Sequence, residues 1–301
     1  MVKLMSAKEI FQREKEVIKR EVEKIKKEGY TPGLAAVITS DDPLDLETAR
    51  FFVSKKREDC REVGIYFEVH EMLNKPQGEV LNLMEKLNKR DDISGIIFQK
   101  PLAKFLDEDK IFSSLDPTKD VDGLTPYNKG KLSTHYDFSK DLLPCTAAGI
   151  VELLSYYDVK LEGLDVVIVG RSDLVGRPLR IMLEDLDATV TCLHRKSKNI
   201  LDKISRADMI VCAAGRPPEL YSQDSFKLYG DMVKEGCIVI NVGIRIHPES
   251  KKMYFDVDFD SVAKKAKYIT PNLGGVGLMT RLRLLKNIVI SSKLQLEKVK
   301  P

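Results

Sequence analysis

A lysine stands in the apolar stripe of a predicted helix, in a position that suits proton-transfer chemistry. One face of the helix expected over residues 47–63 carries, by the 3.6-residue period, Ala49, Phe52, Val53, Lys56, Cys60 and Val63. An amine held among apolar side chains is poorly solvated, which favours its neutral form and lowers its pKa. A general acid or base near neutral pH needs such a pKa. The alternative is a structural lysine whose stem covers the core while its amine reaches water.

Three other segments place polar or flexible residues where a predicted strand or loop ends. Gln99, Lys100 and Pro101 end a buried strand, residues 119–123 form a turn with two carboxylates, and residues 274–277 are a glycine-rich loop before the last helix. Glycine lets the backbone come close to a flat ligand. The alternatives are a capping glutamine, a solvated turn and a flexible loop, and each segment taken alone fits its alternative well.

A strand, a turn and a helix in the second half of the chain suit a dinucleotide. Residues 164–170 (LDVVIVG) predict a buried strand that ends at Gly170, and Gly176 opens a helix. The glycines permit a tight turn and a close approach to a pyrophosphate, where the free amides of the helix favour negative charge. The spacing is G-x5-G and not G-x-G-x-x-G, so an ordinary strand–helix turn is the alternative.

The next predicted strand ends in cations, where an NAD enzyme usually carries an acid. Residues 194–198 (HRKSK) include Arg195 and Ser197. Cations and a hydroxyl suit the 2'-phosphate of NADP, which is therefore the predicted cofactor. The alternative is a solvated basic loop.

Two further strand ends are expected to approach the same cofactor. One carries Ala214 and Gly215, and the other carries Gly243 and Ile244. Ligands of open parallel sheets bind at the carboxyl ends of strands, which is where these residues lie. Each glycine suits a simple turn equally well.

Strands and helices alternate along the chain, which predicts an α/β fold with parallel sheets. The 301 residues suit two domains. We expect an N-terminal α/β catalytic domain of residues 1–142 with 280–301, and a C-terminal Rossmann-like, dinucleotide-binding domain of residues 143–279. Buried strands are predicted at residues 34–39, 65–71, 95–99, 164–170, 188–193, 209–213 and 238–242.

Composition excludes several other classes of protein. The net charge is +3, from 49 basic and 46 acidic residues that are interleaved, which argues against a nucleic-acid surface. Five cysteines with no C-x-x-C pair indicate a reducing compartment, so a cytoplasmic protein is expected. None of the four histidines has metal-ligand spacing, and no metal is expected. No targeting segment and no apolar stretch of about 20 residues is found, so no membrane association is expected.

Six ordered segments together resemble the methylenetetrahydrofolate dehydrogenase/cyclohydrolase family across nearly the whole chain. Six motifs in the family's order are specific, whereas one alone would not be. The segments are VSKKREDCREVGI at 53–65, GIIFQKPL at 95–102, DPTKDVDG at 116–123, LPCTAAGI at 143–150, VGRSDLVGRP at 169–178 and TPNLGGVGLMT at 270–280.

The resemblance implies a folate-binding enzyme with two activities and a known site. It implies oxidation of 5,10-methylenetetrahydrofolate by NADP, hydrolysis of the methenyl product to 10-formyltetrahydrofolate, a folate cleft between the domains, and a homodimer. Lys56 matches the catalytic lysine, Gln99 the glutamine that pairs with it, and Asp122 the aspartate that holds the pterin. The remaining matches are Gly170, Arg171 and Ser172 as dinucleotide contacts, Ser197 as a 2'-phosphate contact, Ile244 near the nicotinamide, and Leu273, Gly274, Gly275, Val276 and Gly277 as the loop that covers the folate.

Some positions depart from the family and keep alternatives open. Phe52 replaces a tyrosine one helical turn before the lysine, which keeps a ring for stacking but loses a hydroxyl. Lys100 and Leu273 also differ from the usual residues. These departures bear on the hydrolysis and on the folate geometry more than on the fold. The alternatives are a dehydrogenase without the second activity, another NADP dehydrogenase such as a shikimate-type enzyme, and a non-catalytic folate-binding protein.

Overall fold

The structure is a computed structural model, and it describes residues 2–299. The chain forms two compact units. One spans Met1–Phe11 and Thr146–Thr280, and the other spans Gln12–Cys145 and Arg281–Pro301. Each has its own parallel sheet, so we call them the six-stranded unit and the three-stranded unit. The predicted two-domain α/β fold is confirmed.

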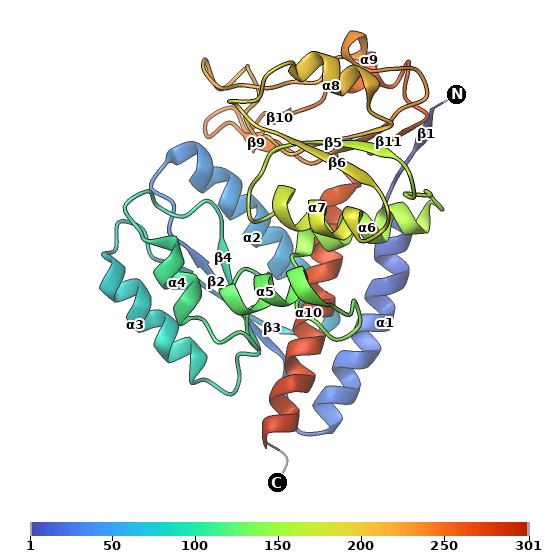
Figure 1. The fold of residues 1–301 in the computed structure, drawn as a ribbon. Coiled ribbons are helices and arrows are strands. Elements are labelled where there is room, and N and C mark those ends of the chain that lie inside the picture. Colours follow the sequence, from blue (N-terminus) through green and yellow to red (C-terminus); the bar gives the residue numbers. More distant parts are fainter. Residues whose placement is uncertain (1, 300–301) are drawn as a thin grey trace. The chain divides into compact units, whose positions relative to one another are not determined.

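The six-stranded unit is a parallel sheet with helices on both faces. Figure 1 shows α6 and α7 on one face and α8 and α9 on the other. The two central strands, at residues 209–212 and 238–241, are almost continuous apolar runs and are fully buried, as expected for a parallel sheet covered on both sides. The strand order is β1 (Lys3–Leu4), β11 (Tyr268–Ile269), β8 (Ile238–Asn241), β7 (Met209–Cys212), β5 (Asp165–Val169) and β6 (Thr189–Leu193). The helices are α6 (Cys145–Tyr156), α7 (Gly176–Glu184), α8 (Ile200–Arg206), η1 (Gly230–Met232) and α9 (Phe259–Val262).

A short antiparallel hairpin follows directly after β8 in this unit. It consists of β9 (Ile244–Ile246) and β10 (Met253–Phe255), with Phe255 opposite Ile244. The chain leaving β10 therefore returns to the carboxyl end of β8. This return brings residue 256 beside a strand end that is far from it in sequence.

The first residues of the chain join the six-stranded unit, which differs from the sequence-based boundaries. Strand β1 pairs in parallel with β11, with Lys3 opposite Tyr268. A two-residue strand carries no periodic pattern, so the sequence alone grouped it with the helix that follows.

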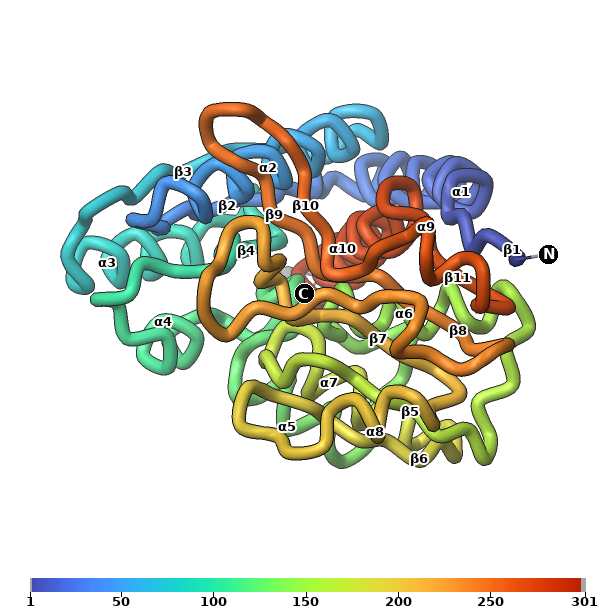
Figure 2. Tube along the Cα trace, turned by 90° about the horizontal axis from the view of Figure 1, so that it is seen from above, coloured from blue at the N-terminus to red at the C-terminus, as the bar shows by residue number. Residues whose placement is uncertain are grey.

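The three-stranded unit contains the parallel sheet β3-β2-β4 and the longest helices. Figure 1 shows α3 and α4 on one side of the sheet and α1 and α10 on the other. Helices α1 and α10 lie side by side, with ion pairs from Glu21 to Lys293 at 2.9 Å and from Glu14 to Lys286 at 3.5 Å (Figure 2). The strands are β2 (Gly33–Ile38), β3 (Tyr66–Glu71) and β4 (Gly95–Gln99), and the helices are α1 (Lys8–Lys27), α2 (Pro43–Val63), α3 (Gln77–Asn88), α4 (Glu108–Ser114), α5 (Pro126–Thr134) and α10 (Val276–Val299).

Helix α2, which carries Lys56, has well-defined ends. The side chain of Asp42 accepts the amides of Leu44 at 2.9 Å and Asp45 at 3.3 Å, and Pro43 fills the first helical position. Gly64 ends the helix at φ 81°, a left-handed conformation that glycine adopts without steric cost. These caps fix where the helix starts and stops, and so where along the sheet Lys56 lies.

Residues 2–299, which the structure describes, contain neither a metal-binding cluster nor a membrane-spanning helix. Within that range no group of three or more His, Cys, Asp or Glu side chains is arranged to hold a metal ion. None of the helices described there combines the length and apolar character needed to cross a membrane. All five cysteines, which lie within the same range, are free thiols.

Candidate active site

Lys56 and Gln99 form a hydrogen-bonded pair inside the three-stranded unit. The Lys56 amine donates to Gln99 Oε1 at 2.8 Å, and Gln99 Nε2 donates to the Lys100 carbonyl at 3.3 Å. The amine is buried in protein although the side chain as a whole is only half-buried, and this desolvation lowers the pKa of Lys56. The negative charge of Asp122 acts in the opposite direction. A desolvated amine that donates to a neutral amide oxygen loses its proton more readily than a solvated lysine, as a general acid or base must.

Asp122 stands in a turn that is held by a second, fully buried carboxylate. Asp120 accepts the amides of Leu124 at 3.0 Å and Thr125 at 2.7 Å, and also the Asn128 side chain at 2.8 Å. These bonds consume both oxygens of Asp120, which is 1% exposed. Of the two carboxylates in the predicted turn, Asp120 is therefore structural. Asp122 is half-buried and acts electrostatically on Lys56.

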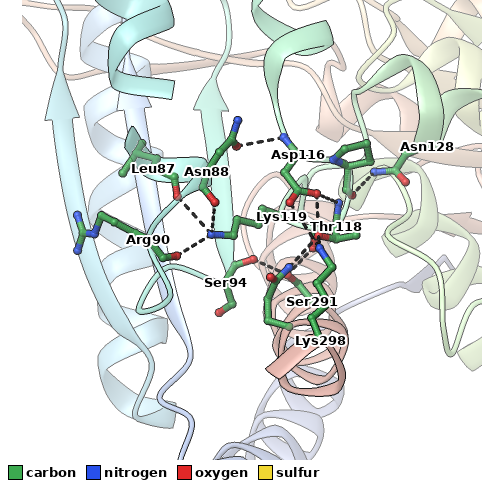
Figure 3. A network of polar contacts seen from close by, with 12 residues as sticks. Leu87, Asn88, Arg90, Ser94, Asp116, Thr118, Lys119, Asn128, Ser291 and Lys298 are labelled. Atoms are coloured by element: carbon green, nitrogen blue, oxygen red, sulfur yellow. Dashed lines mark hydrogen bonds and ion pairs between the residues drawn. The ribbon is translucent and has the colours of Figure 1, made fainter. Parts of the chain in front are cut away.

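Lys119 anchors the same turn to the end of helix α3 (Figure 3). Its buried amine donates to the carbonyls of Leu87 at 3.3 Å, Asn88 at 2.8 Å and Arg90 at 2.6 Å. The last carbonyls of a helix have no partner within the helix, so a cation there satisfies them and also suits the helix dipole. Lys119 thus fixes the segment that carries Asp122, a role that the sequence did not reveal.

We expect Lys119→Met to destabilise the protein by about 2–4 kcal/mol, because buried carbonyls would lose charge-assisted hydrogen bonds. Urea unfolding at constant pH measures this change. The matched control is Lys110→Met, since Lys110 is 70% exposed and forms only a surface pair with Asp107 at 3.3 Å; we expect an effect within about 0.5 kcal/mol there. Equal losses in the two variants would contradict the anchoring role.

The other predicted substrate residues of the three-stranded unit lie next to the lysine–glutamine pair in sequence. Phe52 is half-buried, one helical turn before Lys56, with its ring edge-on to Phe51 at 5.5 Å. The Lys100 amine pairs with Glu108 at 2.5 Å and lies 5.5 Å from the centre of the Phe112 ring. Pro101 follows and is half-buried. The amine of Lys100 is thus already engaged by α4, which the sequence did not show.

A buried ion pair holds α2 to α10 close to Lys56. Arg281 Nε lies 3.0 Å from Asp59 Oδ2, and Asp59 is 4% exposed. Burial raises the pKa of Asp59 to about 6, against the opposing effect of the Arg281 charge. This pair has no signal in the sequence, because its two residues are more than two hundred positions apart.

The strand–turn–helix of the six-stranded unit depends on the absence of side chains at two glycines. Gly170 has φ 129°, and a Cβ built on it would lie 2.4 Å from the Ala213 carbonyl oxygen. A Cβ on Gly176 would lie 2.2 Å from the Gly170 carbonyl oxygen. Arg171 and Ser172 are exposed between them, and Ser172 Oγ accepts the Val175 amide at 3.2 Å. The turn therefore packs backbone on backbone ahead of the N-terminus of α7, which suits a pyrophosphate.

The loop after β6 forms a tight, basic turn. Ser197 Oγ accepts the His194 amide at 3.0 Å, and the Ser197 amide donates to the His194 carbonyl at 2.7 Å. Arg195 is exposed and pairs with Asp224 at 3.1 Å. An exposed pair of this kind contributes little stability, so the guanidinium can exchange its partner. The turn presents a cation and a hydroxyl at the end of β6.

The ends of β7 and β8 meet at a buried carboxylate that the sequence analysis missed. The Gly215 amide donates to Asp256 Oδ2 at 2.8 Å. A Cβ on Gly243 would lie 1.9 Å from the same oxygen, so this glycine is required by packing. Ala214 and Ile244 are the half-buried neighbours of these two glycines. Asp256 carried no local signal because the β9–β10 hairpin alone brings it to this place.

The glycine-rich segment at 273–277 divides into an exposed loop and a helix start. Leu273 is 57% exposed, and the Gly274 carbonyl accepts the Ala7 amide at 2.7 Å. Gly275 precedes α10, and Val276 and Gly277 are its first residues. A Cβ on Gly277 would meet nothing within 4 Å, so its surroundings are open. Asn272, just before the segment, accepts a hydrogen bond from Asn241 at the end of β8 at 2.8 Å.

These features define a class of protein: a two-unit α/β enzyme with a buried lysine–glutamine pair in one unit and a dinucleotide-type turn in the other. The chain belongs to the tetrahydrofolate dehydrogenase/cyclohydrolase family. Residues 5–122 match the family's catalytic domain, and residues 144–296 match its NAD(P)-binding domain. The predicted family is confirmed, and this membership excludes the shikimate-type alternative.

A related sequence and two related solved structures support the same family assignment. The chain is 49% identical over 293 residues to the bifunctional protein FolD of Pyrobaculum aerophilum, covering 96% of this chain and 94% of that protein. It matches the structure of the bifunctional FolD of Campylobacter jejuni with a TM-score of 0.86 and 39% identity, over 98% of this chain and 99% of that one. It also matches Trypanosoma brucei FolD, solved with NADP and an inhibitor, with a TM-score of 0.87 and 29% identity, over 100% of this chain and 99% of that one.

Proposed function

We propose that this chain oxidises 5,10-methylenetetrahydrofolate with NADP and hydrolyses the methenyl product to 10-formyltetrahydrofolate. The observation that carries the proposal is the 2.8 Å bond from the buried Lys56 amine to Gln99, with Asp122 acting on the same amine. The pair lies in the part of the chain that matches the family's catalytic domain, which supports a catalytic role in one-carbon chemistry. A non-catalytic folate-binding protein would have no need of a desolvated amine.

The six-stranded unit fits a dinucleotide, whose role is to accept a hydride from the methylene carbon. Gly170 and Gly176 leave room for a pyrophosphate at the start of α7, and Arg171 and Ser172 are exposed beside it. The chain's contribution to this step is binding and orientation. We propose that the ends of β7 and β8 orient the nicotinamide half, as expected for strand ends in an open sheet.

Hydrolysis of the methenyl cation requires proton transfer, which we assign to Lys56. Water adds to the cationic carbon and loses one proton to the neutral amine of Lys56, which leaves a hydroxyl on that carbon. The ammonium form of Lys56 then protonates N5, and the bond from the carbon to N5 breaks as the hydroxyl releases its own proton to solvent and becomes the formyl carbonyl, so that one proton is released overall. Gln99 holds the amine in place, while we propose that Asp122 holds the pterin ring, with Phe52 stacking close by. Lys100 and Pro101 are proposed to complete the folate-binding residues of this unit, and the segment 273–277 remains a proposed folate contact.

We propose NADP as the preferred cofactor, because β6 does not end in the Asp or Glu that usually binds the ribose of NAD. The loop after β6 instead carries Arg195 and Ser197. Asp224 occupies Arg195 in the structure, and a phosphate would be the stronger partner for a guanidinium. We also propose that the enzyme is a cytoplasmic homodimer. Sedimentation of the purified protein tests the oligomeric state.

The deciding experiment is a coupled assay with methylenetetrahydrofolate and either NADP or NAD. We expect reduced dinucleotide and methenyl absorbance to appear together, then methenyl to convert to formyl product faster than the uncatalysed rate. NADP should give at least a tenfold lower KM than NAD. Methenyl that accumulates without enzymatic hydrolysis would support the dehydrogenase-only alternative raised by Phe52. No reduction with a folate or methanopterin donor would support the non-catalytic alternative.

A further inference from the structure

Asp256 is a fully buried carboxylate that the proposed chemistry does not use. It is 0% exposed and follows strand β10 in the six-stranded unit. Its Oδ2 accepts the Gly215 amide at 2.8 Å, its own amide donates to the Gly243 carbonyl at 3.2 Å, and its carbonyl accepts the Leu228 amide at 2.8 Å. The side chain and the backbone of one residue therefore contact the loops that follow both β7 and β8.

The two strand ends are packed tightly around this carboxylate. A Cβ on Gly243 would lie 1.9 Å from Oδ2 and 2.6 Å from Oδ1, so the carboxylate rests directly on the Gly243 backbone. The amides of Val242 and Gly243 both donate to the Cys212 carbonyl, at 2.9 and 3.0 Å. The ends of β7 and β8 and Asp256 consequently form one backbone cluster in which none of the three can shift alone.

Burying a carboxylate is unfavourable, because the charge loses its hydration. Burial raises the pKa of Asp256, while the amides of Gly215 and Ala214 and the charge of Arg245 oppose that rise. Among the described residues, the carboxylate forms no close ion pair that would offset the free energy of its desolvation. Its Oδ1 also has no hydrogen-bond partner among them. What the carboxylate does provide is a fixed position for the Gly215 amide against Gly243.

We propose that Asp256 is a positioning residue for the dinucleotide, setting the shape of the loops 213–216 and 242–244 that orient its nicotinamide half. This inference rests on the proposed function, because it takes those strand ends to be the cofactor site. Arg245 adds to the same arrangement: its guanidinium lies 3.6 Å from where a Gly215 Cβ would be, and its Nε donates to the Tyr221 hydroxyl at 3.2 Å.

The test compares Asp256→Ala and Asp256→Asn with the unmodified protein. NADPH affinity is followed by NADPH fluorescence, and methenyl hydrolysis, which needs no dinucleotide, is measured on the same samples. We expect Asp256→Ala to raise the Kd for NADPH and the KM for NADP at least tenfold, with hydrolysis within twofold. Asp256→Asn keeps an accepting oxygen for the Gly215 amide, so we expect its Kd to stay within threefold.

A third variant separates positioning from loss of stability. Asp258 caps α9 by accepting the Ser261 amide at 3.2 Å, two residues beyond Asp256. Asp258→Ala should lower the melting temperature of the protein while leaving the Kd for NADPH within twofold. All variants are assayed at a temperature at which their melting curves show them folded.

The outcomes distinguish the two proposals. A folded Asp256→Ala that binds NADPH as tightly as the unmodified protein overturns the positioning role, and so does a folded Asp256→Asn that loses affinity as fully as the alanine variant. If the unmodified protein binds NADPH but reduces no NADP with methylenetetrahydrofolate, the proposed function fails, whereas the assignment of Asp256 still stands or falls on the measured affinities. An unmodified protein that does not bind NADPH overturns both.

Discussion

Replacing Lys56 by methionine should abolish enzymatic methenyl hydrolysis, a fall of about 10²–10⁴-fold, while most of the dehydrogenase rate remains. The physical reason is that the two reactions make different demands on the protein. Hydrolysis moves protons, and Lys56 carries the buried amine bonded to Gln99. Hydride transfer depends on orientation and needs no base at that atom. The measurement is the ratio of formyl to methenyl product in the coupled assay.

The fold should survive this substitution. Burial lowers the pKa of Lys56 in the folded state, so between that pKa and the unfolded value the unfolded chain binds one more proton than the native protein. The amine therefore contributes a destabilisation that is absent at high pH and fully present below its folded pKa. Methionine removes this cost, so the melting temperature at pH 7 should stay level or rise. The hydrolysis rate of the unmodified enzyme should increase with pH through the lowered pKa of Lys56.

The neighbouring lysine provides the control. Lys55 is partly exposed and pairs with Glu58 at 2.8 Å, so Lys55→Met keeps the helix and changes a surface pair only. Hydrolysis should remain within twofold in that variant.

Gln99→Leu should lower the hydrolysis rate less than Lys56→Met does. Adding Gln99→Leu to Lys56→Met should not lower the rate further, because the pair acts as a unit. Equal loss of hydrolysis and NADP reduction in a folded Lys56→Met protein would refute this division of roles.

The residues that sequence analysis identified share one property: their signal is local. Lys56 interrupts an apolar stripe, Gly170 and Gly176 bracket a strand–helix turn, and β4 has the predicted bounds because its apolar pattern starts and stops there. Local patterns also predicted β2, β5, β7 and β8 to within one residue at each end, whereas the two-residue strand β11 was not predicted. The two-domain α/β architecture follows from these elements in sequence order.

The residues that it missed owe their roles to contacts between distant segments. Lys119 looks like part of a solvated turn until the end of α3 and the residues just after it supply three carbonyls. Asp256 directly follows a short hairpin whose strands of three residues carry no period. Helix α5 was hidden because Pro126 and Gly130 indicate a turn, whereas Thr125 caps the helix and Pro126 opens it. Tertiary contacts decide each of these cases.

Replacing Gly170 by alanine should weaken dinucleotide binding more than tenfold and destabilise the protein by about 2–5 kcal/mol. Two causes act together at this position. The φ of 129° is one that side chains rarely adopt, and the added Cβ would lie 2.4 Å from the Ala213 carbonyl oxygen. That oxygen belongs to backbone next to the end of β7, where the Ala213 amide bonds to Val169 at 2.9 Å. The turn must therefore shift, and with it the position of the helix N-terminus that receives the pyrophosphate.

Two other glycines serve as controls that distinguish backbone strain at positive φ from the steric clash of an added Cβ. Gly236 has φ 77° with nothing within 4 Å of an added Cβ, so Gly236→Ala should cost about 1–2 kcal/mol from strain alone and leave NADPH affinity unchanged. Gly78, in the first turn of α3, has an ordinary φ and open space, so Gly78→Ala should be neutral or slightly stabilising. Affinity follows from NADPH titration and stability from urea unfolding. If Gly170→Ala binds NADPH as tightly as Gly236→Ala does, the turn between β5 and α7 does not form the pyrophosphate site, and the cofactor must be held by other parts of the six-stranded unit.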